Sequence, residues 1–98
     1  MISQKIQLKH KSAEGCVIPL GPVNLVSAHT DVGMIGCGAF DIMALNAFDY
    51  PAVKVKGRQG PIAALEDLLE GEVKEVNTQA AARGIKVGMS GLDALELL

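Results

Sequence analysis

The sequence predicts an α+β fold, a two-layer α/β sandwich in which N-terminal β hairpins precede alternating strands and short helices on one face. Up to residue 38, apolar and polar residues alternate between Gly and Pro breaks, as in strands. From residue 39 on, strand patterns alternate with short stretches of helical spacing. Since 98 residues support one modest core, we expect a single domain, 1–98, with a β-rich oligomerisation region at 1–38 and an α/β region at 39–98.

The N-terminal half is predicted to be mostly sheet. Residues 5–11 alternate with period two, which is typical of a strand with one solvated face. A turn is expected at 12–15. Three more strands then follow, at 16–20, 23–30 and 34–37.

Asp41 is placed to cap a helix, because its carboxylate can accept amide hydrogens of the first turn. One side of this helix would carry the apolar residues Ile42, Ala44, Leu45 and Phe48. Tyr50 and Pro51 end it, and a strand follows at 52–56.

The C-terminal part is predicted to contain three helices and one strand. Pro61 suits the first position of a helix that ends at Gly71, and a strand follows at 72–76. A second helix starts at Asn77 or Thr78 and ends at Gly84, a position typical of a left-handed cap. The last helix is opened by Ser90 and Asp93, which have capping-box spacing, and its inward residues are Leu92, Leu95 and Leu98.

The composition argues against nucleic acid as a partner. The formal charge is −2 and aromatic residues make up 3% of the chain, so neither a basic field nor stacking surfaces are available. The N-terminus lacks the unbroken apolar stretch of a secretory signal, which places the protein in the cytoplasm. Cys16 and Cys37 form no CxxC pair, and in a reducing compartment they are expected to be buried thiols.

The segment from Cys16 to Phe40 has Asp31 as its only formal charge. It is nearly as long as a membrane span, but its Pro and Gly residues break the backbone too often for a helix in lipid, so no membrane contact is expected. We interpret it as strands with more apolar surface than a few short helices can cover. Self-association into a homo-oligomer is therefore predicted.

A glycine-rich junction between a strand and the Asp41 helix is the first candidate site. Exposed amides at such a junction can hold a small anionic metabolite, with Gly36, Cys37, Gly38 and Asp41 as the candidate ligands. Arg58, in the loop before the Pro61 helix, is the cation that could pair with it. The alternatives are a glycine bulge or close strand crossing, and an Arg58 that is solvated or ion-paired between subunits.

A thiol enzyme is a second possibility. Cys37 near a helix start could become a thiolate, with His29 as its base and Asp31 or Asp41 orienting the ring. The alternative is that Cys37 is a small buried hydrophobe. His10 and His29 lack the spacing of metal ligands, so we predict no metal and no cofactor.

Several motifs occur here in the order and spacing of a known family. They are Gly33 to Gly38, the strand Ala52 to Gly57, Leu65 to Leu69, and the segment Arg83 to Gly91 with Ala94 to Glu96. The chain resembles the YunC-like family, small bacterial and archaeal proteins of unknown function. That resemblance implies a two-layer α/β domain whose N-terminal β region mediates tetramerisation, and it brings no established activity.

The expected function is thus that of a homo-oligomeric cytoplasmic domain of unknown role, binding a small anionic metabolite. The alternatives are a thiol-dependent enzyme using Cys37 and a structural assembly or interaction module.

Overall fold

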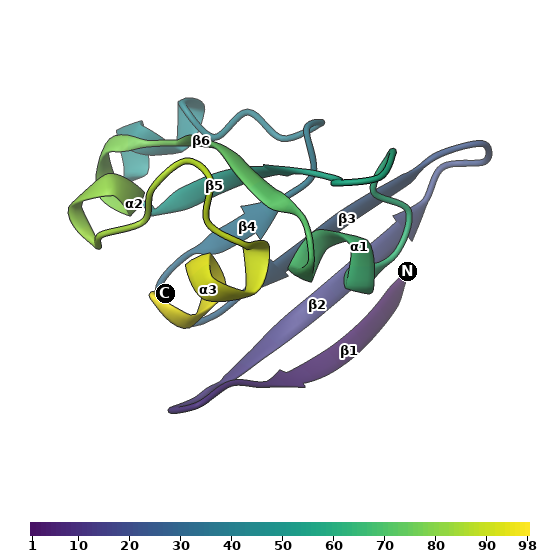
Figure 1. Ribbon diagram of the computed structural model, residues 1–98, viewed down its shortest axis with the longest axis horizontal. Coiled ribbons are helices and arrows are strands. Elements are labelled where there is room, and N and C mark those ends of the chain that lie inside the picture. The colour runs from purple at the N-terminus through teal and green to yellow at the C-terminus, as the bar shows by residue number, and fades with distance from the viewer.

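The computed structural model describes residues 1–98 and contains one six-stranded mixed sheet (Figure 1). The strands lie in chain order, and each pairs antiparallel with the next except β4 and β5, which are parallel. Their bounds are β1 Ile2–Gln7, β2 Ser12–Pro19, β3 Asn24–His29, β4 Met34–Gly36, β5 Ala52–Lys56 and β6 Glu72–Val76. The α+β two-layer prediction is confirmed.

The helices are all short. They are the 3₁₀ helix η1 at Ala44–Phe48, α1 at Leu65–Leu69, α2 at Thr78–Ala82 and α3 at Gly91–Glu96. In Figure 1, α1 and α3 lie against the face of the sheet that is turned to the viewer, while η1 belongs to the crossover between β4 and β5. None of these helices has the length and apolar character needed to span a bilayer.

The predicted position of the first turn is wrong. The turn falls at residues 8–11, where Leu8 N donates to Lys11 O over 2.8 Å, and the expected turn at 12–15 lies inside β2. Gln7 Nε2 also donates to Leu8 O, which helps to hold the turn. The alternating pattern suggested that the strand continues through Leu8, because Leu8 is apolar. Leu8 is indeed buried, but it lies in the turn after the end of β1.

Three helical predictions also need correction. Phe48, expected on the buried side, is 76% exposed, and the crossover helix is only a five-residue 3₁₀ segment. Leu92, expected to point inward, is 39% exposed, whereas Leu95 and Leu98 are buried as predicted. The helix expected from Pro61 begins at Leu65.

The late start of α1 has a visible cause. Asp67, in the first turn of α1, accepts hydrogen bonds at Oδ2 from Ala63 N and Ala64 N. Both distances are 3.0 Å, and these bonds cap the start of the helix. Asn24 Nδ2 donates to Ala63 O over 2.8 Å. These bonds hold the chain before Leu65 in a non-helical conformation, beside the turn end of the β2–β3 hairpin.

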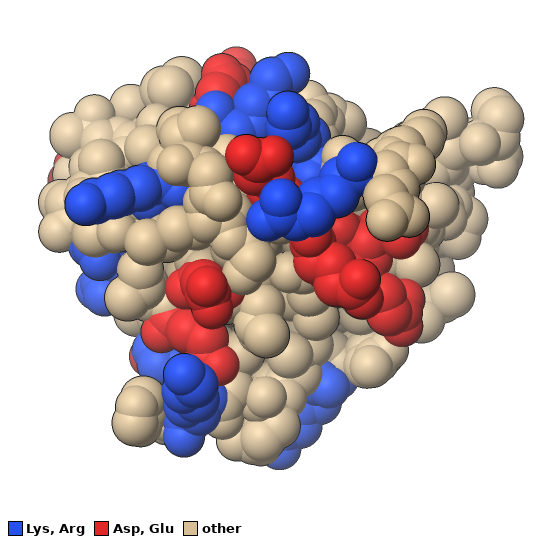
Figure 2. All heavy atoms as spheres, in the orientation of Figure 1, with Lys and Arg blue, Asp and Glu red and all other residues tan.

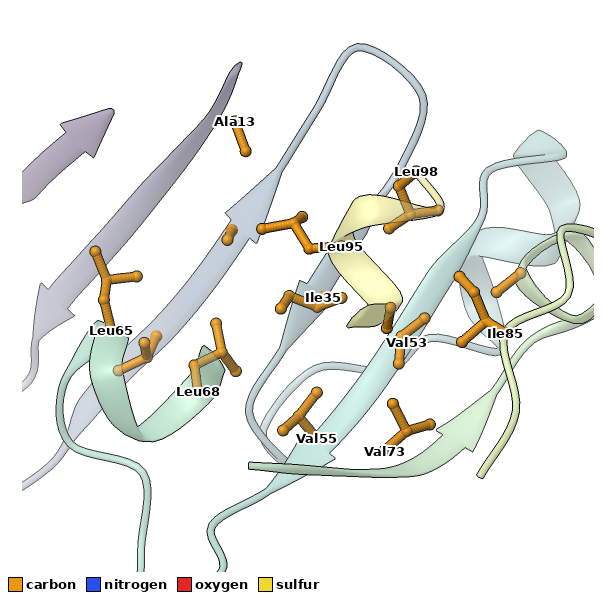
Figure 3. Packing of buried hydrophobic residues seen from close by; sticks show 14 of the residues in the cluster. Ala13, Ile35, Val53, Val55, Leu65, Leu68, Val73, Ile85, Leu95 and Leu98 are labelled. Carbon is orange, nitrogen blue, oxygen red and sulfur yellow. The ribbon is translucent and has the colours of Figure 1, made fainter. Parts of the chain in front are cut away.

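The core lies between the sheet and the helices α1 and α3 (Figure 3). Leu65 and Leu68 of α1, with Leu95 of α3, point toward the sheet in that view. The strands supply buried aliphatic side chains to meet them, among them Val26, Ala28, Ile35, Val53, Val55 and Val73. Burying a Val or Ile side chain of this set contributes about 1.5–3 kcal/mol.

A single buried side chain, Asn77, ties the crossover to the sheet. Its Oδ1 accepts from Ala52 N and Ala80 N, and its Nδ2 donates to Ile42 O and Tyr50 O, over 2.8–3.1 Å. The bond from Ala80 N makes Asn77 the cap of α2, as predicted. The amide therefore has four partners and leaves no polar atom unpaired in the interior.

Candidate interaction surface

The two faces of the sheet can be told apart by one glycine. A Cβ built on Gly15 would lie 2.5 Å from Leu65 Cδ1, so Gly15 faces the helix-covered side. Side chains alternate along a strand, and cross-strand partners share a face. Cys16 and Ile18 therefore point to the opposite face, together with their partners Ser27 and Leu25 on β3.

This opposite face, called the back face below, has an apolar part that no helix covers. Ile18, Leu25 and Met34 are half-buried on it. The ring of Phe40 also lies there, since a Cβ on Gly36 would meet Phe40 Cδ2 at 2.6 Å and Met34 Cε at 2.8 Å. With the hairpin residues Leu20 and Val23, these side chains form what we call the apolar patch: Ile18, Leu20, Val23, Leu25, Met34 and Phe40.

The turn between β2 and β3 extends the patch beyond the body of the protein. It is closed by a hydrogen bond from Leu20 N to Val23 O over 2.7 Å. Leu20 is 52% and Val23 is 58% exposed. Figure 1 shows the hairpin projecting at the right, and Figure 2 shows that its tip carries no charged side chain. An exposed apolar projection of this kind is typical of an interaction site.

The other end of the back face is polar. The strand register places Lys5, Glu14, His29 and Met34 side by side on four neighbouring strands. Lys5, Glu14 and His29 also line a groove of about 400 Å³ together with Ser12, Ala13, Thr30 and Asp31. His29 is thus the direct cross-strand neighbour of Met34, a member of the apolar patch.

Asp31 at the rim of this groove is paired. Lys11 Nζ lies 3.0 Å from Asp31 Oδ1, and this hydrogen bond and charge lower the pKa of the Asp31 carboxyl below its usual range. Lys11 Nζ also donates to Leu98 O over 2.9 Å. The pair therefore links the first turn, the β3–β4 turn and the end of α3.

Ion pairs border the back face on the side of β5 and β6. Lys54 Nζ lies 3.3 Å from Glu75 Oε1, and Lys56 Nζ lies 4.0 Å from Glu72 Oε1. The apolar patch is therefore framed by charges of both signs, on β1 and β2 at one side and on β5 and β6 at the other.

The glycine-rich junction is partly filled by the protein itself. Gly36 is covered by Phe40, and Cys37 is buried with its N–H donating to Val26 O over 3.0 Å. Gly38 is exposed with open space beside its Cα. Asp41 Oδ1 accepts from Ala44 N over 3.2 Å, as its capping role requires, although the helix is only 3₁₀.

Arg58 belongs to a different surface. Its Nε donates to Glu70 O over 2.8 Å, and its Nη1 lies 3.8 Å from Glu72 Oε1. Next to it is a polar cavity of about 330 Å³ that also contains Asp67 and Glu70. Acidic side chains gather over α1 in Figure 2, so Arg58 is held in an acidic environment.

The structure does not bring His29 to Cys37. His29 pairs with Met34 at the start of β4, whereas Cys37 follows the end of that strand, about 10 Å farther along. Cys16 and Cys37 are both free thiols, the first half-buried and the second buried. His10, His29 and the carboxylates form no cluster that could hold a metal ion.

Sequence reasoning located the chargeless region but missed the composition of the patch. In a strand that begins at Ser12, side chains alternate between the two faces of the sheet. This alternation places Cys16 and Ile18 on one face and Val17 on the other. Phe40 gave no signal, because its position over Gly36 depends on a chain reversal that the sequence does not specify.

Comparison with known proteins identifies the family. A family model described as "Domain of unknown function (DUF1805)" matches residues 36–98. The chain belongs to this family. The matched region starts at Gly36, the last residue of β4, so β1, β2 and β3 lie outside it.

Two relatives of the DUF1805 chain cover nearly its whole length. One is "Uncharacterized protein YunC" of Bacillus subtilis (strain 168), 32% identical over 90 residues, which are 92% of this chain and 89% of YunC. The other is the crystal structure of a "Protein of Unknown Function TA1206" from Thermoplasma acidophilum. It matches with a TM-score of 0.83 and 25% identity over 96% of this chain and 91% of that one. The YunC-like resemblance is therefore confirmed.

Proposed function

We propose that this DUF1805 chain is a homo-oligomeric module, whose copies associate through the apolar patch on the back face of the N-terminal β region. The observation that carries the proposal is the patch itself. Six large apolar side chains lie together on one face that none of the chain's helices covers. A second copy supplies the burial that the chain lacks.

The arrangement of charges supports a second copy as the occupant. Interfaces between proteins have an apolar centre and a polar rim. Here the patch is bordered by Lys5 and Glu14 on one side and by the pair Lys54 and Glu75 on the other. When two identical faces meet about a two-fold axis, each rim offers both signs of charge to its partner.

Four copies are the expected assembly. A two-fold contact between back faces makes a dimer, and two such dimers make a tetramer, the state that the family resemblance implies. The cytoplasm is the expected compartment, in keeping with two free thiols, one of which is half-buried on the associating face.

Static light scattering after size exclusion tests the proposal. The wild-type protein at micromolar concentration is expected to have the mass of several chains, with four as the predicted number. Replacing both Leu20→Glu and Val23→Glu introduces charges at exposed positions of the patch, breaks the back-face contact and is expected to give a smaller assembly than the wild type. The control is Phe48→Glu, which alters a still more exposed apolar side chain outside the patch and is expected to leave the mass unchanged. A wild-type protein that scatters as a single chain contradicts the proposal.

A small anionic metabolite is the second candidate, as a ligand of the junction between β4 and η1. The main-chain N–H groups of Gly38 and Ala39 donate to no group of the chain. They follow β4 at the carboxyl end of the only parallel strand pair, where α/β sheets commonly bind ligands. Arg58 follows β5 at the same end, but its guanidinium already contacts Glu70 and Glu72.

Thermal-shift screening against phosphorylated and carboxylated metabolites tests this second proposal. A ligand present at 100 times its Kd is expected to stabilise the protein by about 2.7 kcal/mol. Gly38→Pro, which removes one of the two free N–H groups, is expected to abolish the shift. If no compound shifts the transition, this ligand proposal is rejected, and the proposal of self-association is unaffected.

A further inference from the structure

We infer that His29 makes the self-association of this protein sensitive to pH, with assembly weakening as the pH falls from 8.0 to 5.5. This inference rests on the proposed association through the back face. It adds to that proposal a specific residue, a direction and a condition under which the subunits separate.

The position of His29 carries the inference. The strand register pairs His29 on β3 with Met34 on β4, so the imidazole is the immediate cross-strand neighbour of an apolar-patch residue. Cross-strand neighbours on one face have Cβ atoms about 4.5–5.5 Å apart. A second copy that covers Met34 therefore also covers His29, which is exposed in the single chain.

The charges around His29 set the direction of the effect. Glu14 faces it from β2, Lys5 lies beyond Glu14 on β1, and Asp31 in the β3–β4 turn is paired with Lys11. From β4 the neighbour is the uncharged Met34. These four charged groups carry two positive and two negative charges, so they balance while the imidazole is neutral.

Protonation of His29 upsets that balance. Histidine is the side chain whose charge ordinarily changes between pH 5 and 8. Each back face would then carry an unbalanced positive charge at the margin of the contact. Covering a charged imidazole with apolar surface costs desolvation, and a two-fold contact brings two such charges toward each other.

Glu14 limits the effect but does not remove it. No hydrogen bond or ion pair joins Glu14 to His29 or to Lys5, in contrast to the paired side chains of β5 and β6. Lys5 competes for the same carboxylate. One carboxylate between two cations compensates only one of them, so the net positive charge remains.

Analytical ultracentrifugation of the full chain at pH 8.0 and pH 5.5 tests the inference. The dissociation constant is expected to be at least about tenfold larger at pH 5.5, since a positive charge beside Met34 opposes the contact of two apolar faces. His29→Gln keeps a polar side chain of similar size that does not titrate, and is expected to assemble equally at both values. The control is His10→Gln in the exposed β1–β2 turn, which is expected to retain the full pH dependence.

The outcomes separate the inference from the proposal beneath it. Assembly of the wild-type protein that is equally strong at both pH values overturns the inference and leaves the proposed association intact. Unchanged pH dependence in His29→Gln also overturns it. Single chains at pH 8.0 contradict the proposed association itself, and the inference falls with it. Circular dichroism at pH 5.5 is expected to match that at pH 8.0, and a lost fold at pH 5.5 also overturns the inference.

Discussion

The two faces of the sheet differ in how they are covered, although the same strands build both. On the helix-covered face, Val26, Ile35 and Val53 are fully buried beneath α1 and α3. On the back face, the patch residues Ile18 and Leu25 remain half-exposed. The first face is completed within the chain, whereas the second has an apolar centre and no cover of its own.

This difference separates stability from association. Side chains on the helix-covered face determine whether a single chain folds, because their burial is already complete in one copy. Side chains of the apolar patch gain their main burial only when a second copy is added. Substitutions on the two faces should therefore change different measured quantities.

The largest expected effect compares two leucines. Leu95→Ala on the helix-covered face is expected to lower the free energy of unfolding by about 3–4 kcal/mol, because it leaves a cavity in a closed core. Leu25→Ala on the back face is expected to cost about 1 kcal/mol or less. Urea denaturation of dilute protein checks both values. Equal losses for the two substitutions would remove the distinction between the faces.

The next largest effect is expected at Asn77, which belongs to neither face. Its side chain holds the crossover between β4 and β5 through buried hydrogen bonds. Asn77→Ala is expected to cost about 2–3 kcal/mol, since the N–H groups of Ala52 and Ala80 lose a buried acceptor. Asn77→Asp keeps that acceptor but loses the two bonds to Ile42 O and Tyr50 O. Thermal unfolding checks these values, and an alanine variant as stable as the wild type would contradict this role.

Two glycines give a smaller contrast between the faces. An added methyl at Gly15 meets Leu65 inside the core, whereas at Gly36 it meets the half-exposed Phe40 and Met34. Gly15→Ala is therefore expected to cost about 1–3 kcal/mol through overpacking. Gly36→Ala should cost less, because the Phe40 ring can move toward solvent. Urea midpoints of the two variants measured side by side decide the order.

The smallest expected effect concerns Asp31 at the edge of the polar groove. Its pKa is lowered in the folded protein by Lys11, so the pair stabilises the fold at pH values above the ordinary carboxyl range. That stabilisation is lost as the pH falls through the lowered pKa. Asp31→Asn should be slightly less stable than the wild type at pH 7. The difference should disappear in acid, and a difference that persists at pH 2 would contradict this account.

Much of the fold could be predicted from sequence, because local chemistry determines it. Asn77 and Ser90 cap their helices through side-chain oxygens, as short polar residues do before an apolar run. Gly84 adopts a left-handed conformation, with φ of 87°, at the end of α2. The strand at Ala52–Lys56 has the predicted bounds.

The errors arose where long-range contacts decide. Leu8 has the pattern of a strand residue, but it lies in the turn after β1 and reaches the core from there. Pro61 suits a helix start, yet Asp67 and Asn24 bind the segment before Leu65 in another conformation. For the candidate site, the sequence grouped Arg58 with the glycine junction, and only the tertiary structure shows its contacts with Glu70 and Glu72.

The two cysteines allow the most direct measurement. Cys16 reports on burial by a second copy, and Cys37 reports on burial within the single chain. Cys16 lies on the back face beside the patch, and Cys37 is buried within the chain. Alkylation by iodoacetamide, followed by mass spectrometry over a range of protein concentrations, is expected to slow sharply at Cys16 as the subunits assemble. Cys37 should react slowly at every concentration. A Cys16 alkylation rate that is independent of protein concentration would contradict the account that a second copy covers the back face.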